Sequence, residues 1–299
     1  MPVVLEVEHT TTYTYANPVT FGEHRAIFLP RGSHGGRILG YEVKTSIPSR
    51  THWISDTLSN NVAVIAFNEP GSQLSVTCKF RVVHFGLKGV EAFPLDSRAE
   101  LIPVQYTPSE WTDLVVYLQP CEDDPDGSVA AWAKSFTLGD LYETRDVLQR
   151  MMNTVRDTFT YEARNEEGTR TPGETLAKKS GTCRDYAWLM IEALRRLGIA
   201  CRFVTGYLYD SALDGGDDGK TGSGATHAWL EVYLPGAGWL SYDPTNRITE
   251  GFDLIQVAIA RRPEQAVPLA GSWFGAPGDY LGMKVDVAVR KLAALPDFT

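Results

Sequence analysis

A cysteine, a histidine and an aspartate in the second half of this 299-residue chain could together form a nucleophilic site. Cys183 opens a run with apolar residues at helical spacing, which places it in the first turn of a predicted helix. Unsatisfied backbone N–H groups and the positive end of the helix dipole stabilise a thiolate there, and Arg184 adds a positive charge. Position alone leaves open that Cys183 is inert, because free cysteines are usually small buried hydrophobes.

The predicted helix covers residues 183–197 and has recognisable signals at both ends. Thr182 followed three residues later by Asp185 is a capping-box pattern, with Asp in place of the usual Glu. Gly198 suits the position just past the last turn. Alternating residues predict three strands after the helix, at 199–209, 226–234 and 239–243.

His227 and Asp243 lie on the polar faces of the second and third of these strands. If Leu234-Pro235-Gly236 is the hairpin loop, His227 lies directly opposite Asp243, whereas a longer loop would offset the two. A carboxylate fixes the tautomer of an imidazole and supports its positive charge, and the imidazole generates the thiolate. The three residues therefore predict acyl transfer, in which Cys183 attacks a carbonyl, His227 protonates the leaving amine and a second nucleophile resolves the thioester.

Further groups around these three residues complete the predicted site. The oxyanion needs two donors, one of them the backbone N–H of Cys183 and the other a side chain, with Tyr161, Trp229 and Trp239 as candidates. The glycine-rich loop at 210–225 is long and ends beside His227, so it is expected to act as a lid. Its aspartates lack EF-hand spacing, and metal sites usually bring closely spaced ligand pairs, so neither a metal nor another cofactor is expected.

The rest of the chain divides into three predicted parts. Short alternating runs separated by turn signals predict an antiparallel β-sandwich domain over 1–100. A proline-rich and acidic stretch predicts a connector with short helices over 101–139, including one near 110–117. Residues 140–299 are assigned to the catalytic core. The single histidines of the first part and the cysteines at 78 and 201 are expected to be structural.

Composition limits the partners and the compartment. The net charge is −9 without a basic cluster, which argues against binding to nucleic acid or an anionic membrane. No apolar run reaches membrane-spanning length, and the first residues do not have the pattern of a signal peptide. Four cysteines without CxxC spacing disfavour a disulfide framework or a structural zinc site. A reducing, cytoplasmic setting is therefore expected.

Four stretches in order resemble the core of the transglutaminase-like superfamily: Gly181–Ala187, Leu197–Tyr207, His227–Val232 and Gly238–Thr245. The N-terminal residues His9–Tyr15, Leu29–Arg31 and Leu58–Asn61 resemble the β-domain that precedes this core in bacterial members. The resemblance implies an α+β protein in which an antiparallel β-sandwich precedes a papain-like core. In that core a helix bearing Cys183 packs on an antiparallel sheet bearing His227 and Asp243.

The resemblance also implies a cysteine enzyme that acts on peptide or glutamine-type amide bonds, with a protein or peptide as substrate. Water or an amine can resolve the thioester, and hydrolysis is favoured because bacterial members are often assumed to be peptidases. Transamidation is the alternative within this class. A non-catalytic protein-binding module on the same scaffold is the alternative from another class.

Overall fold

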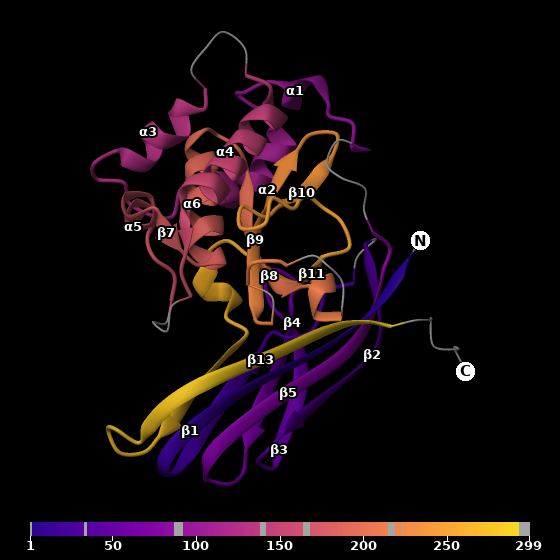
Figure 1. Ribbon diagram of the computed structural model, residues 1–299, viewed down its shortest axis with the longest axis vertical. Coiled ribbons are helices and arrows are strands. Elements are labelled where there is room, and N and C mark those ends of the chain that lie inside the picture. Colours follow the sequence, from indigo (N-terminus) through magenta and orange to yellow (C-terminus); the bar gives the residue numbers. More distant parts are fainter. Residues whose placement is uncertain are drawn as a thin grey trace.

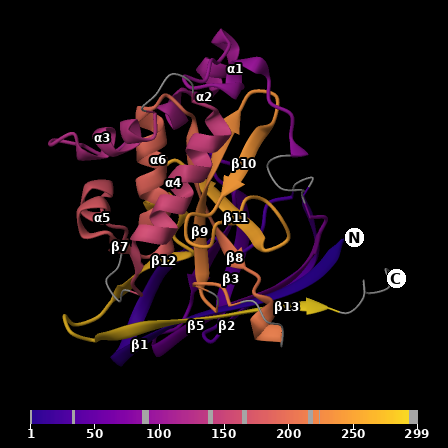
Figure 2. The same cartoon turned by 45° about the horizontal axis from the view of Figure 1, so that its top comes forward.

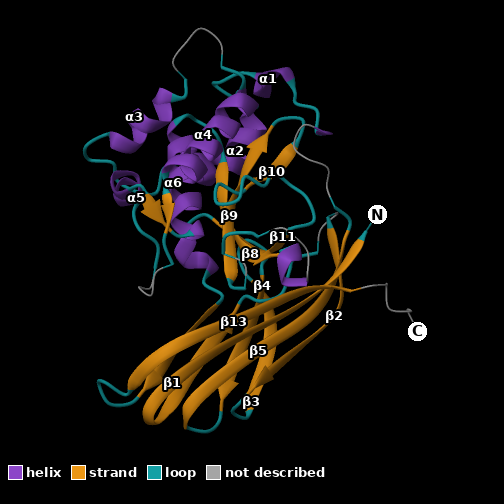
Figure 3. Ribbon diagram, in the orientation of Figure 1, coloured by secondary structure: helices purple, strands orange, loops and turns teal. Residues whose placement is uncertain are grey.

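A computed structural model of the protein describes residues 2–32, 35–86, 92–137, 142–163, 168–214, 219–222 and 224–292. The strands are β1 (Val3–Ala26), β2 (Gly36–Thr45), β3 (Ser49–Ser55), β4 (Asn61–Phe67), β5 (Gly71–His84), β6 (Thr160–Tyr161), β7 (Ser180–Gly181), β8 (Cys201–Leu208), β9 (Thr226–Leu234), β10 (Gly238–Tyr242), β11 (Leu254–Ala260), β12 (Leu269–Phe274) and β13 (Tyr280–Leu292). The helices are α1 (Ser97–Glu100), α2 (Pro108–Leu118), α3 (Ser128–Ser135), α4 (Thr144–Thr158), α5 (Pro172–Lys178) and α6 (Cys183–Arg196). The long strands form one end of the molecule, and the helices with a smaller sheet form the other (Figure 1 and Figure 3).

The β-domain is organised around β1, which is 24 residues long and pairs with four other strands. Its first part lies between β5 and β13, and its last residues lie between β4 and β12. All of these pairings are antiparallel, with β2 added beside β5 and β3 beside β4. Alternate apolar side chains such as Leu5 and Val7 point into a continuous core, as the period of two along a strand requires. The predicted antiparallel β-domain is thus confirmed.

The last strands of the chain differ from the predicted division into domains. The predicted catalytic core covers residues 140–299, but β13 pairs with β1 along the register from Val4↔Leu292 to Tyr15↔Tyr280, and β12 also pairs with β1. Residues 269–292 therefore belong to the N-terminal sheet. Local periodicity predicts that a strand exists, but it does not say which distant strand supplies its hydrogen bonds. Residues 293–299 lie outside the described part of the chain.

The second unit is an α+β core in which α6 packs on a sheet of order β10-β9-β8-β11. Ala228, Leu230 and Val232 of β9 face α6 in one apolar cluster, while α3, α4 and α5 pack around the helix. Figure 2 shows α4 and α6 alongside the strands of this sheet. The predicted arrangement of a cysteine-bearing helix on an antiparallel sheet is confirmed. The helix predicted near 110–117 is α2, which begins at a capping box on Thr107.

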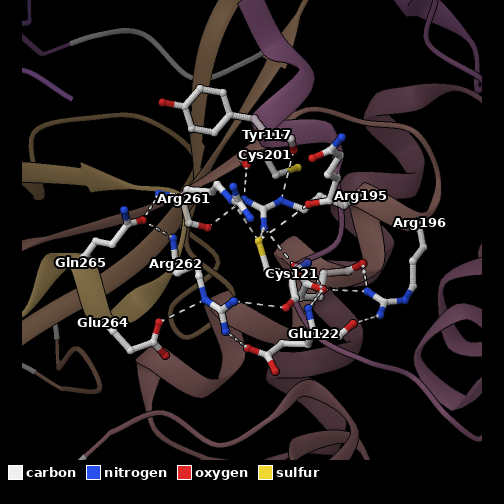
Figure 4. Close-up of polar contacts among 12 residues, drawn as sticks. Tyr117, Cys121, Glu122, Arg195, Arg196, Cys201, Arg261, Arg262, Glu264 and Gln265 are labelled. Carbon is white, nitrogen blue, oxygen red and sulfur yellow. Dashed lines mark hydrogen bonds and ion pairs between the residues drawn. The ribbon is translucent and has the colours of Figure 1, made fainter. Parts of the chain in front are cut away.

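A buried polar cluster attaches the second half of α6 to neighbouring segments of the chain (Figure 4). The carboxylate of Glu192 accepts hydrogen bonds from the backbone N–H groups of Cys121 and Glu122, and Arg195 donates to Glu192 at 3.0 Å. Arg195 also donates to the carbonyl oxygens of Cys201 and Arg261, both at 2.9 Å. Removing one partner of such a buried pair is strongly destabilising. The connector and the end of β11 are thereby attached to the helix that carries Cys183.

Two buried polar groups join the β-domain to the core. The side chain of Asn60 donates to the carbonyl of Ile259 at 2.8 Å and accepts from its N–H at 2.9 Å. These are the two backbone groups that a residue of a neighbouring strand would bind. His9 contacts the hydroxyl of Tyr207 through Nδ1 and that of Thr11 through Nε2, both at 2.9 Å. The prediction that His9 is a satisfied core residue is confirmed, whereas His34 lies outside the described residues.

His9 makes the stability of the fold dependent on pH. Desolvation lowers its pKa to about 4, so the folded protein keeps the ring neutral while the unfolded chain takes up a proton below about pH 6.5. Stability is therefore lost as the pH falls from about 6.5 towards 4, and His9 contributes no pH dependence above that window. Between about pH 7.5 and pH 5 the expected loss from His9 is about 2 kcal/mol.

Urea unfolding at these two pH values measures that contribution when wild type is compared with His9→Gln. All other titrating groups are common to the two proteins, so the variant is expected to lose about 2 kcal/mol less on acidification. An equal loss in both proteins would contradict the assignment of a neutral, buried His9.

Candidate active site

The N-terminus of α6 has the local structure that its sequence predicts. Thr182 is the N-cap, in an extended conformation, and Cys183 is the first residue of the helix. The Asp185 carboxylate accepts hydrogen bonds from the backbone N–H of Thr182 at 2.8 Å and from its hydroxyl at 3.1 Å. It also accepts from the N–H of Arg170 at 2.7 Å. The predicted capping box is therefore present, and it fixes the turn that carries Cys183.

A short parallel pair of strands brings Tyr161 to the cysteine. β6 and β7 pair through Tyr161↔Gly181, two residues before Cys183. Position 181 accommodates only glycine without movement, because a Cβ there would lie 2.8 Å from the Cβ of Asp185. Burial, followed by the nearby sulfur of Cys183, raises the pKa of Tyr161, so the phenol is neutral and can donate a hydrogen bond. The candidate Tyr161 thus lies beside Cys183.

His227 and Asp243 are in direct contact and buried from solvent. Nε2 of His227 lies 2.8 Å from Oδ2 of Asp243, and the two residues are 1% and 0% exposed. Asp243 also accepts hydrogen bonds from the N–H of Thr245 at 2.8 Å and from the side chain of Asn246 at 3.0 Å. The carboxylate is therefore held in place from three sides.

The predicted hairpin register was wrong by two residues. Trp239 pairs with Tyr233, so the three residues between the paired strand ends are 235–237 rather than 234–236. A shift of two residues keeps every side chain on its predicted face, because the period of a strand is two. Asp243 then leaves the ladder after Tyr242 and bridges Ile248 instead, which allows its side chain to reach His227. The contact between His227 and Asp243 was therefore predicted, but from an incorrect register of the two strands.

The three side chains shift one another's pKa values in the direction that a thiolate–imidazolium pair requires. Burial lowers the pKa of His227, but the charges of Asp243 and Cys183 outweigh it and the pKa is raised. Burial raises the pKa of Cys183, but His227, the backbone of Ala228 and Arg184 outweigh it and the pKa is lowered. Nδ1 of His227 is buried and has no hydrogen-bond partner among the described residues. It is thus the ring nitrogen left for the sulfur, since Nε2 is bound to Asp243.

Gly222 of the predicted lid lies close to this nitrogen. A Cβ on Gly222 would lie 3.2 Å from the Tyr161 hydroxyl and 3.4 Å from Nδ1 of His227, and the φ of Gly222 is +85°. Asn246 holds the segment through Thr221, accepting from its N–H at 2.9 Å and donating to its carbonyl at 3.1 Å. Sequence reasoning missed Asn246, which contacts both Thr221 and Asp243. Residues 215–218 and 223 lie outside the described part, so lid movement stays a prediction.

The two tryptophan candidates lie in different places. Trp229 stacks on His227 with ring centroids 6.0 Å apart, and its buried Nε1 has no hydrogen-bond partner among the described residues. Trp239 contacts Arg202, Tyr117 and Tyr233 at the other end of the hairpin. Trp229 and Tyr161 thus lie next to the predicted reacting groups. Among the described residues, Trp239 makes no ring, charge or hydrogen-bond contact with these groups.

The described residues contain neither a cluster of metal ligands nor a membrane-spanning helix. No group of three or more His, Cys, Asp or Glu side chains there is arranged to hold a metal ion. No helix in the same part of the chain is both long and apolar enough to span a bilayer. All four cysteines are free, and Cys121 is the only one that is not buried.

The fold and the site together define a class: an α+β protein with a cysteine at a helix start beside a buried His–Asp pair. Residues 130–244 match the transglutaminase-like superfamily, and residues 5–83 match the bacterial transglutaminase-like N-terminal region. The chain belongs to the transglutaminase-like superfamily, as the resemblance predicted.

Three known proteins are similar to this chain over different lengths. The uncharacterized protein ML0607 of Mycobacterium leprae is 27% identical over 297 residues, which cover 95% of this chain and 98% of that protein. A protein-glutamine gamma-glutamyltransferase of Pseudomonas aeruginosa is 39% identical over 70 residues, which cover 23% of this chain and 10% of that enzyme. The crystal structure of a candidate cysteine protease from Cytophaga hutchinsonii covers 100% of this chain and 93% of its own, with a TM-score of 0.71 and 18% identity, and it has the same fold.

Proposed function

We propose that the protein is a cysteine-dependent enzyme that breaks peptide or glutamine-type amide bonds through a thioester on Cys183. The observation that carries the proposal is the buried contact of 2.8 Å between His227 and Asp243, which leaves Nδ1 of the same ring for the sulfur. A thiolate at a helix N-terminus beside an imidazolium is the activated form of a cysteine nucleophile. The family, which is typically composed of cysteine-dependent enzymes, supports this choice.

In the first half of the proposed reaction, the thiolate of Cys183 attacks the amide carbonyl and forms a tetrahedral oxyanion. The backbone N–H of Cys183 and either Tyr161 or Trp229 stabilise the negative charge. The C–N bond then breaks as the imidazolium of His227 protonates the leaving amine. Asp243 stabilises the ring while it carries a positive charge.

In the second half, the neutral His227 takes a proton from an incoming nucleophile, which attacks the thioester and releases the thiolate. We propose water as this nucleophile, and hence a peptidase or amidase. Cys183 is 5% exposed, and its near-complete burial favours a small nucleophile over the side chain of a folded protein. The free cysteines are consistent with the proposed reducing, cytoplasmic compartment.

The test is an incubation of a peptide library with the purified protein, with and without a primary amine, read by mass spectrometry. Cleaved peptides, or glutamine side chains converted to acids, are expected whether or not the amine is present. If the amine is added to the peptide in preference to water, the reaction is transamidation and the proposal of hydrolysis is wrong. Peptides left intact under all conditions would favour the non-catalytic binding module.

A further inference from the structure

The strand β13 forms one edge of the long sheet of the β-domain (Figure 1). Among the described residues it pairs with β1 alone, and the register with β1 is regular from Gly282 to Leu292. Alternate residues of an antiparallel strand direct their N–H and C=O groups to opposite sides, so about half of these groups in β13 point away from β1. A long edge of this kind is a template for another strand.

The edge strand β2, which pairs with β5, is interrupted, whereas this part of β13 is not. The register of β2 with β5 shifts between Ile38 and Gly40. Such an irregularity bends a strand and disfavours pairing along its free edge. The stretch Gly282–Leu292 contains neither a proline nor a shift of register, so it lacks both of these protections.

The two faces of β13 differ in character. Met283, Val285 and Val287 lie on the face that borders the β-domain core, because side chains alternate along a strand. Val287 packs against that core, whereas Met283 is 47% exposed. Lys284 and Asp286 lie on the opposite face and form an exposed ion pair of 2.7 Å. The same part of the edge thus offers a partner an apolar side chain and two opposite charges.

A second copy of β13 matches both faces when the strands run antiparallel and Val285 lies opposite itself. Lys284 of each copy then lies opposite Asp286 of the other, so a symmetric dimer contains this pair twice. On the core face, Met283 lies opposite Val287 of the second copy. The exposed methionine is thereby covered, and the apolar core continues across the edge.

Neighbouring registers place like charges opposite each other. In a two-fold symmetric pair of antiparallel strands, one residue lies opposite itself at the axis. With Lys284 or Asp286 at the axis, two equal charges meet. With Val287 at the axis, Lys284 meets Arg290, which also repels it.

The register centred on Ala288 is the alternative with matched charges. It places Asp286 opposite Arg290 of the second copy. It leaves Met283 beyond the end of the other β13, however, so this side chain stays exposed. The register centred on Val285 satisfies the charges and covers the methionine, and it is therefore favoured.

We propose that the protein forms a symmetric dimer in which two copies of β13 pair antiparallel about Val285 and join the two β-domain sheets into one. The partner is a second copy of this chain, because the edge is complementary to itself in both charge and apolar surface. The proposal does not depend on the proposed function, since β13 carries none of the residues of the candidate active site. Turnover is expected to be the same in monomer and dimer.

Analytical ultracentrifugation of the full chain measures the dimer directly. At chain concentrations up to about 200 μM, the wild type is expected to reach twice the chain mass of 33.0 kDa. Asp286→Lys and Lys284→Asp are each expected to weaken the dimer about tenfold or more, because each creates two contacts between like charges. The double variant carries both substitutions and restores opposite charges at both contacts, so it is expected to regain the dimer.

Glu42→Lys and Lys44→Asp are the matched controls, because Glu42 and Lys44 form an exposed ion pair with the same spacing on β2. Neither control is expected to weaken the dimer, and circular dichroism checks that every variant is folded. A wild type that stays monomeric at all these concentrations would overturn the proposal. So would a dimer that persists in both folded single variants, that the controls weaken equally, or that the double variant does not regain.

A disulfide between copies tests the register. In a Cys121→Ser background, Val285→Cys is expected to form this disulfide under mild oxidation, because the two positions face each other at the axis. Ala288→Cys is expected to stay reduced, since its two positions lie far apart along the paired strands. A disulfide in Ala288→Cys in place of Val285→Cys would overturn the register centred on Val285.

Discussion

Cys183→Ala is expected to abolish the proposed amide-bond activity, with a fall in turnover of about 10³-fold or more and little change in stability. The sulfur is the only atom lost, and the helix start that carries it is held by Asp185, Thr182 and Arg170, which the substitution leaves in place. Peptide turnover followed by mass spectrometry measures the first effect, and thermal unfolding measures the second.

Cys121→Ser is the matched control for this experiment. Cys121 is a free cysteine whose sulfur accepts hydrogen bonds from Arg195 and Arg261, and a serine hydroxyl can accept them as well (Figure 4). The control is expected to keep wild-type turnover. Turnover like that of wild type in Cys183→Ala would rule out the proposed mechanism.

Asp243→Asn is expected to retain weak activity, roughly 10³-fold below that of wild type. The charge of Asp243 raises the pKa of His227, so its removal makes the imidazolium less stable. An amide at position 243 can also donate to Nε2, which would favour the wrong tautomer of the ring. The effect is measured as kcat/KM against pH with the same peptide.

Asp286→Asn serves as the control for loss of one carboxylate, because Asp286 lies exposed on β13, where it pairs with Lys284. It is expected to be as active as wild type. If Asp243→Asn were as active as this control, the carboxylate would have no part in the reaction.

The parts of the site that depend on residues close together in the sequence could be predicted. Thr182 and Asp185 are three residues apart, and their contact depends only on the geometry of one helical turn. The face of His227 follows from strand parity, which survived an error of two residues in the hairpin register. That error arose at the turn, where Gly236 and Gly238 both have positive φ and the strand resumes at Gly238.

The parts that depend on distant pairing could not be derived from sequence patterns. Tyr161 was one of three aromatic candidates, and only its pairing with Gly181 places it beside Cys183. The return of β13 to β1 joins residues more than 260 positions apart, from Tyr15↔Tyr280 to Val4↔Leu292. Asn60 likewise binds the backbone of Ile259 in the other unit, and periodicity carries no information about such a contact.

The reactivity of Cys183 towards iodoacetamide as a function of pH tests the central claim most directly. The measurement uses Cys121→Ser, since the other two cysteines, Cys78 and Cys201, are buried with raised pKa values. At about pH 6, Cys183 is expected to alkylate faster than free N-acetylcysteine, because its thiolate is stabilised by His227 while an ordinary thiol has a pKa of about 8.5. Alkylation of Cys183 no faster than N-acetylcysteine at that pH would contradict an activated thiolate.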